Sequence, residues 1–160
     1  MTRAYARAAP GERAVGKVPR GHRERLTVIG ALGSEGVVAS MSVAAATSGA
    51  VFLAFIEQAL IPALRGRSDA LVVMDNLPAH KAEAVRDALD RAGLSHRYLP
   101  SYSPDFNPIE PCWSKLKGGL RAKAARTLQA LEAELSPALA TITAQDAQGW
   151  FRLGGYGPPN

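Results

Sequence analysis

Two acidic residues, Asp75 and Glu110, stand where the sequence passes from one kind of element to the next, and 34 residues separate them. Asp75 follows a four-residue apolar run, 71–74, of the kind that forms a strand buried on both faces. Glu110 follows a proline-rich turn and opens a segment of helical periodicity. Carboxylate oxygens are ligands that Mg²⁺ prefers. Two carboxylates positioned by rigid elements could therefore hold a divalent cation.

The position of Asp75 at the end of the apolar run is the reason to consider it functional. In open α/β sheets, ligands bind at the edge formed by the carboxyl ends of the strands. The next residues, Asn76-Leu77-Pro78, predict a turn into a helix, because asparagine favours turns and caps and proline is tolerated at a helix start. The alternative is that Asp75 or Asn76 only caps this helix.

Glu110 also has a purely structural alternative. Asn107 suits the N-cap, Pro108 the first helical position and Glu110 the third, where a glutamate completes a capping box. Helical spacing places a buried stripe at Ile109, Trp113, Leu116 and Leu120. The same spacing places a polar face at Glu110, Ser114, Lys117 and Arg121. A carboxylate followed by cations is the pattern expected of a metal ligand beside side chains that contact phosphate groups. An exposed helix face with salt bridges would have the same pattern.

Length, charge and cysteine content limit the class of protein. The 160 residues suit a single domain, and the net charge of +5 is uneven, since residues 1–25 hold seven Lys and Arg side chains against two Glu. This basic N-terminal segment could neutralise the phosphates of a nucleic acid. The alternative is that it is a disordered tail that keeps the protein soluble. Cys112 is the only cysteine, so an internal disulfide is impossible and a reducing, intracellular setting fits. No apolar run approaches the roughly 20 residues of a membrane span.

The remaining patterns predict an alternation of strands and helices. Gly33-Ser34-Glu35-Gly36 predicts a hairpin turn, Pro62 should bend or end the first helix, and Ser136-Pro137 should restart a later one. The expected strands are 25–32, 37–43, 71–74 and 97–99, and the expected helices begin near 48, 79, 108, 127 and 143. The expected organisation is a basic extended or looped segment at 1–23, one domain at 24–153 and a loose tail at 154–160.

Taken together, these motifs resemble one superfamily of enzymes. A strand followed by Asp75-Asn76, a histidine five residues after the aspartate, the segment YLPSYSPDFNPIE at 98–110 and a lysine-bearing helix resemble the DDE transposases of the mariner-like and bacterial insertion-sequence type. The resemblance extends from Met1 to about Tyr156 and is densest at 72–81 and 99–117. The interval of 34 residues matches one subtype of this family.

The resemblance implies a fold and a set of roles. The fold is an α/β ribonuclease-H-like mixed sheet flanked by helices. Asp75 is the second acidic ligand and Glu110 the third, in a site that holds two Mg²⁺ or Mn²⁺ ions in the intact family. Asn76 could orient Asp75, with helix capping as its alternative. His80 could contact phosphate or orient a metal-bound water, with a helix-surface histidine as its alternative.

One departure from the family pattern changes the expected activity. The family's first catalytic aspartate lies on an opening strand, and that strand and a helix-turn-helix region precede the segment that resembles residues 1–16. We therefore expect a catalytic domain truncated at its N-terminus, with weak or absent metal binding and no activity alone. Strands 26–32 and 71–75, which the opening strand would separate, should collapse together or leave a gap. The conceivable substitutes for the absent ligand, none at a matching family position, are Glu24, Glu35 and Asp105.

The leading functional hypothesis is the catalytic domain of an insertion-sequence transposase, whose parent enzyme cuts transposon ends and joins them to target DNA. The expected partners are DNA and either a second copy of the chain or an upstream helix-turn-helix polypeptide, in the cytoplasm with the nucleoid. The side chains expected to follow a DNA backbone are Lys115, Lys117, Arg121 and Lys123. The alternatives are a non-catalytic DNA-binding or interaction remnant and a different ribonuclease-H-like nuclease.

Overall fold

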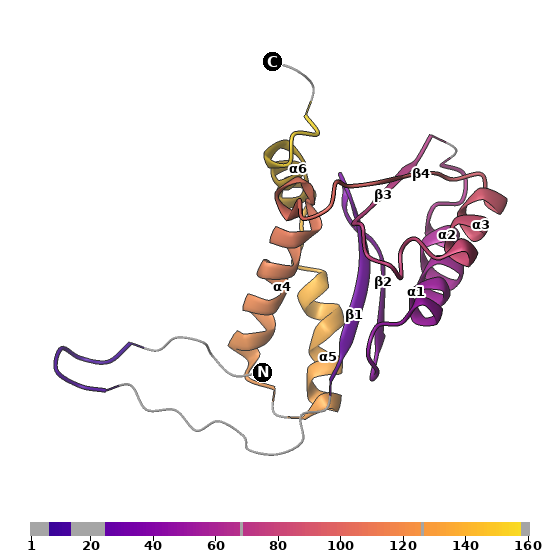
Figure 1. Ribbon diagram of the computed structural model, residues 1–160. Coiled ribbons are helices and arrows are strands. Elements are labelled where there is room, and N and C mark those ends of the chain that lie inside the picture. The colour runs from indigo at the N-terminus through magenta and orange to yellow at the C-terminus, as the bar shows by residue number, and fades with distance from the viewer. Residues whose placement is uncertain (1–6, 14–24, 68, 126, 158–160) are drawn as a thin grey trace.

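The structure of the protein is a computed structural model that describes residues 7–13, 25–67, 69–125 and 127–157 (Figure 1). Most of the basic segment expected at 1–23, the substitute ligand Glu24 and the last residues, 158–160, lie outside the described residues. In chain order the elements are β1 (Thr27–Gly33), β2 (Gly36–Val43), α1 (Gly49–Phe55), η1 (Ile56–Leu60), α2 (Ile61–Ala63), β3 (Leu71–Met74), α3 (Glu83–Arg91), β4 (Ser95–Tyr98), η2 (Pro104–Phe106), α4 (Ile109–Lys123), α5 (Leu128–Leu139) and α6 (Ala144–Leu153).

The strands form two separate sheets of two strands each within the described residues. β1 and β2 are the expected antiparallel hairpin, paired from Thr27 with Val43 to Gly33 with Gly36. Gly36 has a φ of 120°, which a residue with a side chain rarely adopts, so this turn requires a glycine. β3 and β4 are parallel. β1 and β3 are not paired with each other among the described strands, which agrees with the gap, one of the two arrangements expected for them.

Helices lie on both sides of the hairpin, with α1, α2 and α3 on one side and α4 and α5 on the other (Figure 1). β1 contributes to both cores, since Ile29 and Ala31 pack against the first cluster and Val28 packs against the second. Alternation of side chains along a strand sends consecutive residues to opposite faces. β1 is thus covered on both faces, as a strand in the interior of a sheet would be.

The first core forms around α1 and the helical residues that continue it. Ser48 caps α1 by accepting a hydrogen bond from the Val51 N–H at 3.3 Å. The helical path then widens into the π-turn η1 and ends at Ala63, directly after Pro62, as the proline predicts. The fully buried members of this core are Phe55, Ile56, Val85 and Leu89.

The second core joins α4 to α5 and differs from expectation at Pro137. Leu116, Leu120 and Leu135 form its buried centre. α5 continues through Pro137 to Leu139 instead of restarting there. Pro137 lies in the last turn of the helix, so its missing N–H removes only one helical hydrogen bond before the helix ends.

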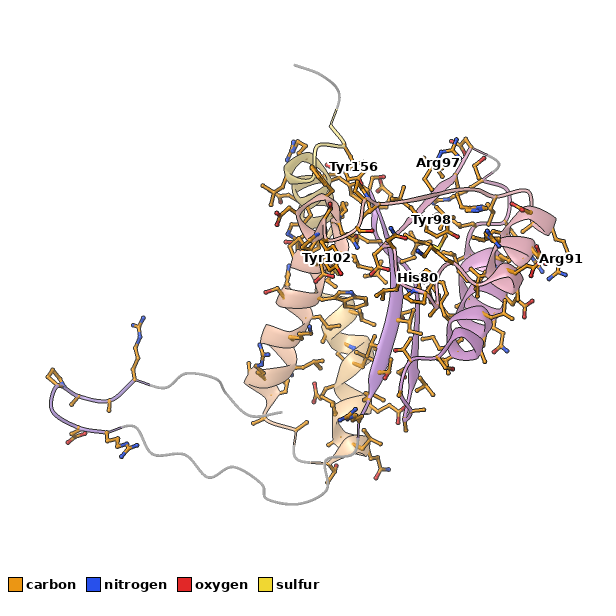
Figure 2. All side chains as sticks on the ribbon, viewed as in Figure 1. His80, Arg91, Arg97, Tyr98, Tyr102 and Tyr156 are labelled. Atoms are coloured by element: carbon orange, nitrogen blue, oxygen red, sulfur yellow. The ribbon has the colours of Figure 1, made fainter. Side chains whose placement is uncertain are left out.

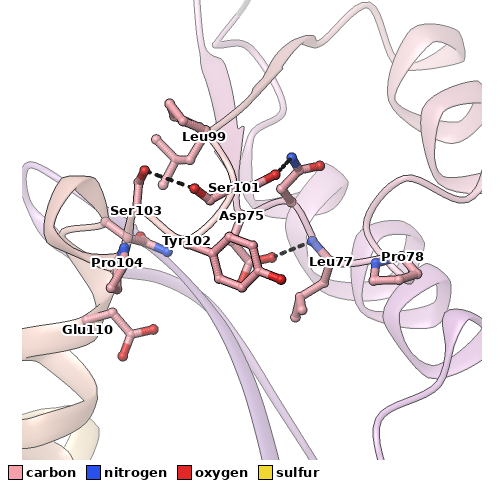
Figure 3. Close-up of a pocket in the computed structure, with 12 residues that line it drawn as sticks. Asp75, Leu77, Pro78, Leu99, Ser101, Tyr102, Ser103, Pro104 and Glu110 are labelled. Carbon is pink, nitrogen blue, oxygen red and sulfur yellow. Dashed lines mark hydrogen bonds between the residues drawn. The ribbon is translucent and has the colours of Figure 1, made fainter.

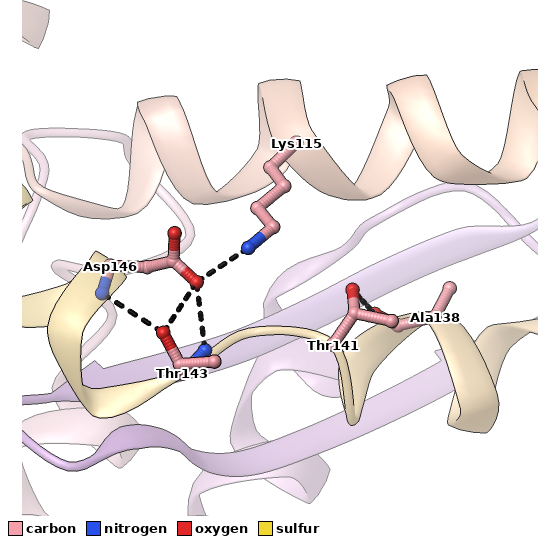
Figure 4. A network of polar contacts seen from close by, with 5 residues as sticks. All are labelled: Lys115, Ala138, Thr141, Thr143 and Asp146. Atoms are coloured by element: carbon pink, nitrogen blue, oxygen red, sulfur yellow. Dashed lines mark hydrogen bonds and ion pairs between the residues drawn. The ribbon is translucent and has the colours of Figure 1, made fainter.

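The last helix, α6, is fixed to α4 by its first turn (Figure 4). Thr143 and Asp146 form a capping box, with the Asp146 N–H donating to Thr143 Oγ1 at 3.1 Å and the Thr143 N–H donating to Asp146 Oδ2 at 2.9 Å. Lys115 of α4 donates to the same carboxylate oxygen at 2.5 Å. In the described part of the chain, no helix has both the length and the apolarity needed to cross a membrane.

Candidate active site

Asp75 directly follows β3 and is held through one carboxylate oxygen. Oδ1 accepts a hydrogen bond from the Leu77 N–H at 3.3 Å and lies 2.5 Å from His80 Nδ1. Oδ2 makes no hydrogen bond with the described residues. The capping alternative therefore accounts for part of what Asp75 does, because its side chain closes the turn at 77–81. It leaves the second oxygen available to a ligand.

His80 lies on this turn, ahead of α3. The helix begins at Glu83 rather than near residue 79, because Ala82 has an extended ψ of 137° that separates the turn from the helix. The imidazole stacks on Phe52 of α1, with ring centroids 4.0 Å apart, and the side chain is only 16% exposed. Nδ1 lies 2.5 Å from Asp75 Oδ1 but forms no well-aligned hydrogen bond with a described residue. His80 is therefore a half-buried contact of Asp75 and not a helix-surface histidine.

Asn76 connects the end of β3 to the loop that follows β4. Its Nδ2 donates to Ser101 Oγ at 2.7 Å, and the structure gives it no bond to Asp75. Ser101 lies in the segment 99–107 that leads to α4. Asn76 therefore acts on the site by restraining this loop. The sequence analysis did not single out Ser101, because a serine in a proline-rich loop carries no signal of its partner 25 residues away.

Glu110 lies in the first turn of α4, one position nearer the helix start than expected. Pro108 occupies the N-cap without a side-chain bond, and Asn107 Oδ1 accepts from the Ile109 N–H at 3.4 Å. Pro108 has the helical angles φ −60° and ψ −16° that a first helical position requires, and Asn107 before it is extended at φ −105° and ψ 101°. The expected capping box is nevertheless absent, since the Glu110 side chain does not reach back to the Asn107 N–H in the described residues. Glu110 is exposed, and its carboxylate forms no hydrogen bond or ion pair with the described residues.

Asp75 and Glu110 line one cavity of about 410 Å³ (Figure 3). The end of β3 contributes Asp75 and its neighbours, the loop after β4 forms much of the wall, and α4 contributes Glu110. Tyr102, at the rim, is fully exposed and has a φ of 58° that a tyrosine rarely adopts. The two acidic residues that the sequence analysis selected therefore meet at one concave site.

The chemistry of this site fits a hard divalent cation, but the number of ligands is small. Two carboxylates provide oxygen donors of the kind that Mg²⁺ and Mn²⁺ take. No group of three or more His, Cys, Asp or Glu side chains able to hold a metal occurs within the described ranges. Glu35 and Asp105 consequently do not complete a three-ligand set with Asp75 and Glu110.

The four cations expected to follow DNA differ in their surroundings on α4. Lys115 is paired with Asp146 at 2.5 Å, and Lys123 Nζ lies 3.4 Å from Glu134. Lys117 is exposed and Arg121 is half-buried, and neither forms an ion pair with a described residue. The unpaired charges of α4 that could meet a phosphate are therefore Lys117 and Arg121.

Asp146 of α6 and Cys112 of α4 have pKa values that their surroundings shift. The hydrogen bond from Lys115, followed by those from Thr143, lowers the pKa of Asp146 to about 2. Burial raises the pKa of the Cys112 thiol to about 11. Cys112 is 1% exposed and therefore packs as an apolar residue, as expected from the sequence.

The C-terminal segment reaches the site through a residue that the sequence analysis did not select. Tyr156 donates its hydroxyl to the Phe106 carbonyl at 2.9 Å, which ties the chain after α6 to the turn before Glu110 (Figure 2). A second cavity of about 430 Å³ is lined by Glu110 together with Trp150, Leu153 and Gly154. No pattern in residues 154–157 indicates this contact, since the partners lie 50 residues apart.

A comparison with protein families is consistent with an acidic site between the end of β3 and the start of α4. The model of the DDE superfamily endonucleases matches residues 1–132 of this chain. The chain belongs to the DDE superfamily of endonucleases. No curated protein matches it in sequence.

Solved structures of Mos1 transposase share the fold. The Mos1 mariner paired-end complex with Mn has a TM-score of 0.76 at 18% identity, covering 97% of this chain and 48% of that one. The pre-cleavage Mos1 transpososome has a TM-score of 0.75 at 18% identity, covering 97% and 49%. The isolated Mos1 catalytic domain has a TM-score of 0.63 at 21% identity, covering 77% and 66%. The fold is therefore that of a ribonuclease-H-like transposase catalytic domain, and the chain spans about half the length of the transposases in these complexes.

Proposed function

We propose that the protein is part of the catalytic domain of an insertion-sequence transposase that acts on transposon ends and target DNA. The observation that carries this proposal is the common cavity of Asp75 and Glu110, at the carboxyl end of β3 and the first turn of α4. The similarity to a Mos1 complex with transposon-end DNA supports DNA as the partner. Because DNA is the proposed substrate, we also propose that the protein acts in the cytoplasm, at the nucleoid.

Asp75 and Glu110 would hold the Mg²⁺ or Mn²⁺ ions of this site. When bound, such ions activate a water or terminal hydroxyl and stabilise the leaving oxygen. The protein's own part is to orient the ligands: His80 and the Leu77 N–H fix one oxygen of Asp75. Asn76 restrains the loop after β4 through its hydrogen bond to Ser101. This loop forms much of the wall of the cavity that Asp75 and Glu110 also line. Mg²⁺ bound by two carboxylates keeps several positions for water and phosphate oxygens.

The ligand count leads us to propose that this chain binds metal weakly and is inactive alone. Two clustered cations repel each other, and two carboxylates offset that repulsion poorly. The described residues offer no third ligand near the pair. A further acidic residue supplied by another polypeptide, either a second copy or one bearing a helix-turn-helix, would complete the site.

Metal-dependent DNA binding tests this function. Mn²⁺ should tighten binding of the chain to a duplex oligonucleotide, because a cation held by Asp75 and Glu110 would offset their negative charge and attract phosphate. Asp75→Asn and Glu110→Gln should each remove that Mn²⁺-dependent gain. The matched control is Asp105→Asn, since Asp105 lies in the turn before Glu110 and lines the second cavity but not the one with Asp75. An equal gain in all four proteins would refute the proposal.

A non-catalytic DNA-binding protein is the second candidate, favoured by the two-ligand site and by the unpaired cations Lys117 and Arg121. This alternative predicts DNA binding that is salt-sensitive but unchanged by Mn²⁺. It also predicts that Asp75→Asn binds DNA at least as well as the wild type, because a negative charge is removed. The same titrations therefore separate the two functions.

A further inference from the structure

We propose that Tyr156, from the segment after α6, is a positioning residue for Glu110 and acts by fixing the turn that precedes α4. The inference rests on the proposed role of Glu110 as a metal ligand. It concerns a part of the molecule beyond the family match, which ends at residue 132.

The turn before Glu110 has little burial of its own. Pro104, Asp105 and Phe106 of η2 are all exposed, and the Phe106 ring is 53% exposed. Segments that bury few apolar side chains open at low free-energy cost. The direction of Glu110 depends on this turn, because the Glu110 N–H donates to the Asn107 carbonyl at 3.1 Å.

Besides the bond from the Ile109 N–H to Asn107 Oδ1 at the start of α4, two side-chain hydrogen bonds tie the loop 100–107 to other described segments. At its start, Asn76 Nδ2 donates to Ser101 Oγ at 2.7 Å, beside Asp75. At its end, the Tyr156 hydroxyl donates to the Phe106 carbonyl at 2.9 Å, four residues before Glu110. One bond therefore restrains the loop on the Asp75 side and the other on the Glu110 side.

Tyr156 is itself held in place by the end of α6. Its N–H donates to the Phe151 carbonyl at 2.9 Å, and its ring meets the Phe151 ring edge to face at a centroid distance of 5.8 Å. Gly155 adopts a φ of 84°, the left-handed conformation that turns the chain back after the helix. Tyr156 remains 41% exposed, and its partial desolvation raises the pKa of the hydroxyl.

α6 provides a fixed base for Tyr156. The Lys115–Asp146 pair joins its first turn to α4, and Ala147 is completely buried. Farther along, Trp150, Leu153 and Gly154 line a cavity with Glu110. Contacts consequently run from α4 through α6 and Tyr156 to the turn, and from the turn back to the start of α4.

Amide hydrogen exchange in Tyr156→Phe tests the proposal without any metal or DNA. The informative amides are Asn107 and Glu110, which donate within the turn at 2.9 and 3.1 Å. Loss of one hydrogen bond should speed their exchange roughly fivefold. The matched control is Tyr98→Phe, which removes a hydroxyl bond of 3.2 Å to the His80 carbonyl, on the Asp75 side. Tyr98→Phe should affect the amides near His80 and leave Asn107 and Glu110 unchanged.

Gly154 supplies an independent variant. A Cβ added there would lie 3.2 Å from Cδ2 and Cε2 of Tyr156, so Gly154→Ala should displace the ring. It should reproduce the faster exchange of Asn107 and Glu110. Gly149→Ala is its control, because a Cβ at Gly149 meets nothing within 4 Å. Exchange at wild-type rates in both Tyr156→Phe and Gly154→Ala would overturn the proposal, as would equal acceleration throughout α1 and α3.

Paramagnetic broadening by Mn²⁺ connects this anchor to the site. In Tyr156→Phe, broadening should weaken at both Glu110 and Asp75 at a given Mn²⁺ concentration, because the ion that they are proposed to share loses a positioned ligand. Unchanged broadening at Glu110 despite faster exchange would contradict a positioning role. If the wild type shows no broadening at either residue, the proposed metal site fails, while the exchange rates still decide whether Tyr156 fixes the turn.

Discussion

Asp75 is restrained by contacts that helix capping alone does not require. Capping needs only the Leu77 N–H, whereas His80 places a second partner 2.5 Å from the same oxygen. The His80 ring is in turn stacked on Phe52, so α1 fixes the direction of the carboxylate through the imidazole. A ligand held in one orientation before the ion arrives is what a metal site needs.

His80→Gln should therefore lower both stability and metal affinity. Loss of the stacked pair and of the contact with Asp75 should reduce the free energy of unfolding by about 1–2 kcal/mol, measured by denaturant titration. Mn²⁺ binding should weaken as well, because Asp75 loses its orientation. The control, His96→Gln, removes a 3.6 Å contact with the exposed Asp90 and an edge-to-face contact with the Tyr98 ring, neither of which involves Asp75, and should change metal binding little. Equal metal affinity in wild type and His80→Gln would contradict this role.

At the scale of elements, α4 carries both a site residue and a charged face. Lys115 forms an ion pair with Asp146 of α6, and Lys123 forms one with Glu134 of α5. Helical spacing alone cannot distinguish these lysines from Lys117 and Arg121. The partners lie on α5 and α6, and their positions depend on how the helices pack.

Lys117→Gln and Arg121→Gln should each weaken DNA binding for every sequence tested. Each substitution should reduce the slope of log affinity against log salt by about 1, measured by fluorescence anisotropy at several salt concentrations. Lys115→Gln is the comparison, because its charge is already paired with Asp146. A loss of slope in Lys115→Gln as large as in Lys117→Gln would show that this division of the cations is wrong.

β3 has exposed apolar side chains, and we expect it to associate with a second copy of the chain. Leu71 is 54% exposed and Val73 is 40% exposed, and β3 is paired with β4 alone among the described strands. An exposed apolar edge strand is a template for pairing with another chain. Leu71→Lys should consequently shift sedimentation velocity profiles toward the monomer. Leu153→Lys, at an 80% exposed position on α6, should leave the association unchanged. Concentration-independent monomers in the wild type would contradict this expectation.

Local patterns predicted most of the elements, because those elements depend on their own residues. The hairpin follows from Gly33 and Gly36, and α1 follows from Ser48 and its apolar spacing. A turn was predicted at 76–78, but its extension to Lys81 and the later helix start at Glu83 were missed, because they depend on the extended ψ of 137° at Ala82. The stacking of His80 on Phe52 was missed too, because the two rings are 28 residues apart in sequence. The capping box was predicted and is absent, because the Glu110 carboxylate makes no hydrogen bond to the Asn107 N–H in the described residues; the helical angles of Pro108 agree with the prediction.

At the scale of the whole molecule, the described core is divided between the two faces of the hairpin. One cluster lies under α1 and α3, and the other joins α4 to α5. The gap between β1 and β3 was foreseen as one of two arrangements, and the family and fold followed from the acidic motifs. The docking of α6 was not foreseen, because Lys115–Asp146 and Tyr156–Phe106 join residues 31 and 50 positions apart.

The α4–α6 connection should make stability depend on acid pH. Its hydrogen bonds lower the pKa of Asp146 from 3.8 to about 2, so the folded state favours the carboxylate. The stabilisation is therefore complete above the unfolded pKa of 3.8 and is lost as pH falls through about 2. Asp146→Asn should be less stable than the wild type at neutral pH, and the difference should vanish in strong acid. A difference that stays constant across this range, in thermal unfolding followed by circular dichroism, would contradict the assignment.

The most direct test of the account is whether Asp75 and Glu110 bind the same ion. Nuclear magnetic resonance of the chain titrated with Mn²⁺ reports this through paramagnetic broadening of the signals of both residues, even when binding is weak. We predict that the two signals broaden with the same concentration dependence and that Asp75→Asn removes the broadening at Glu110. Broadening at Glu110 that persists unchanged in Asp75→Asn would show that the two carboxylates do not share a metal site.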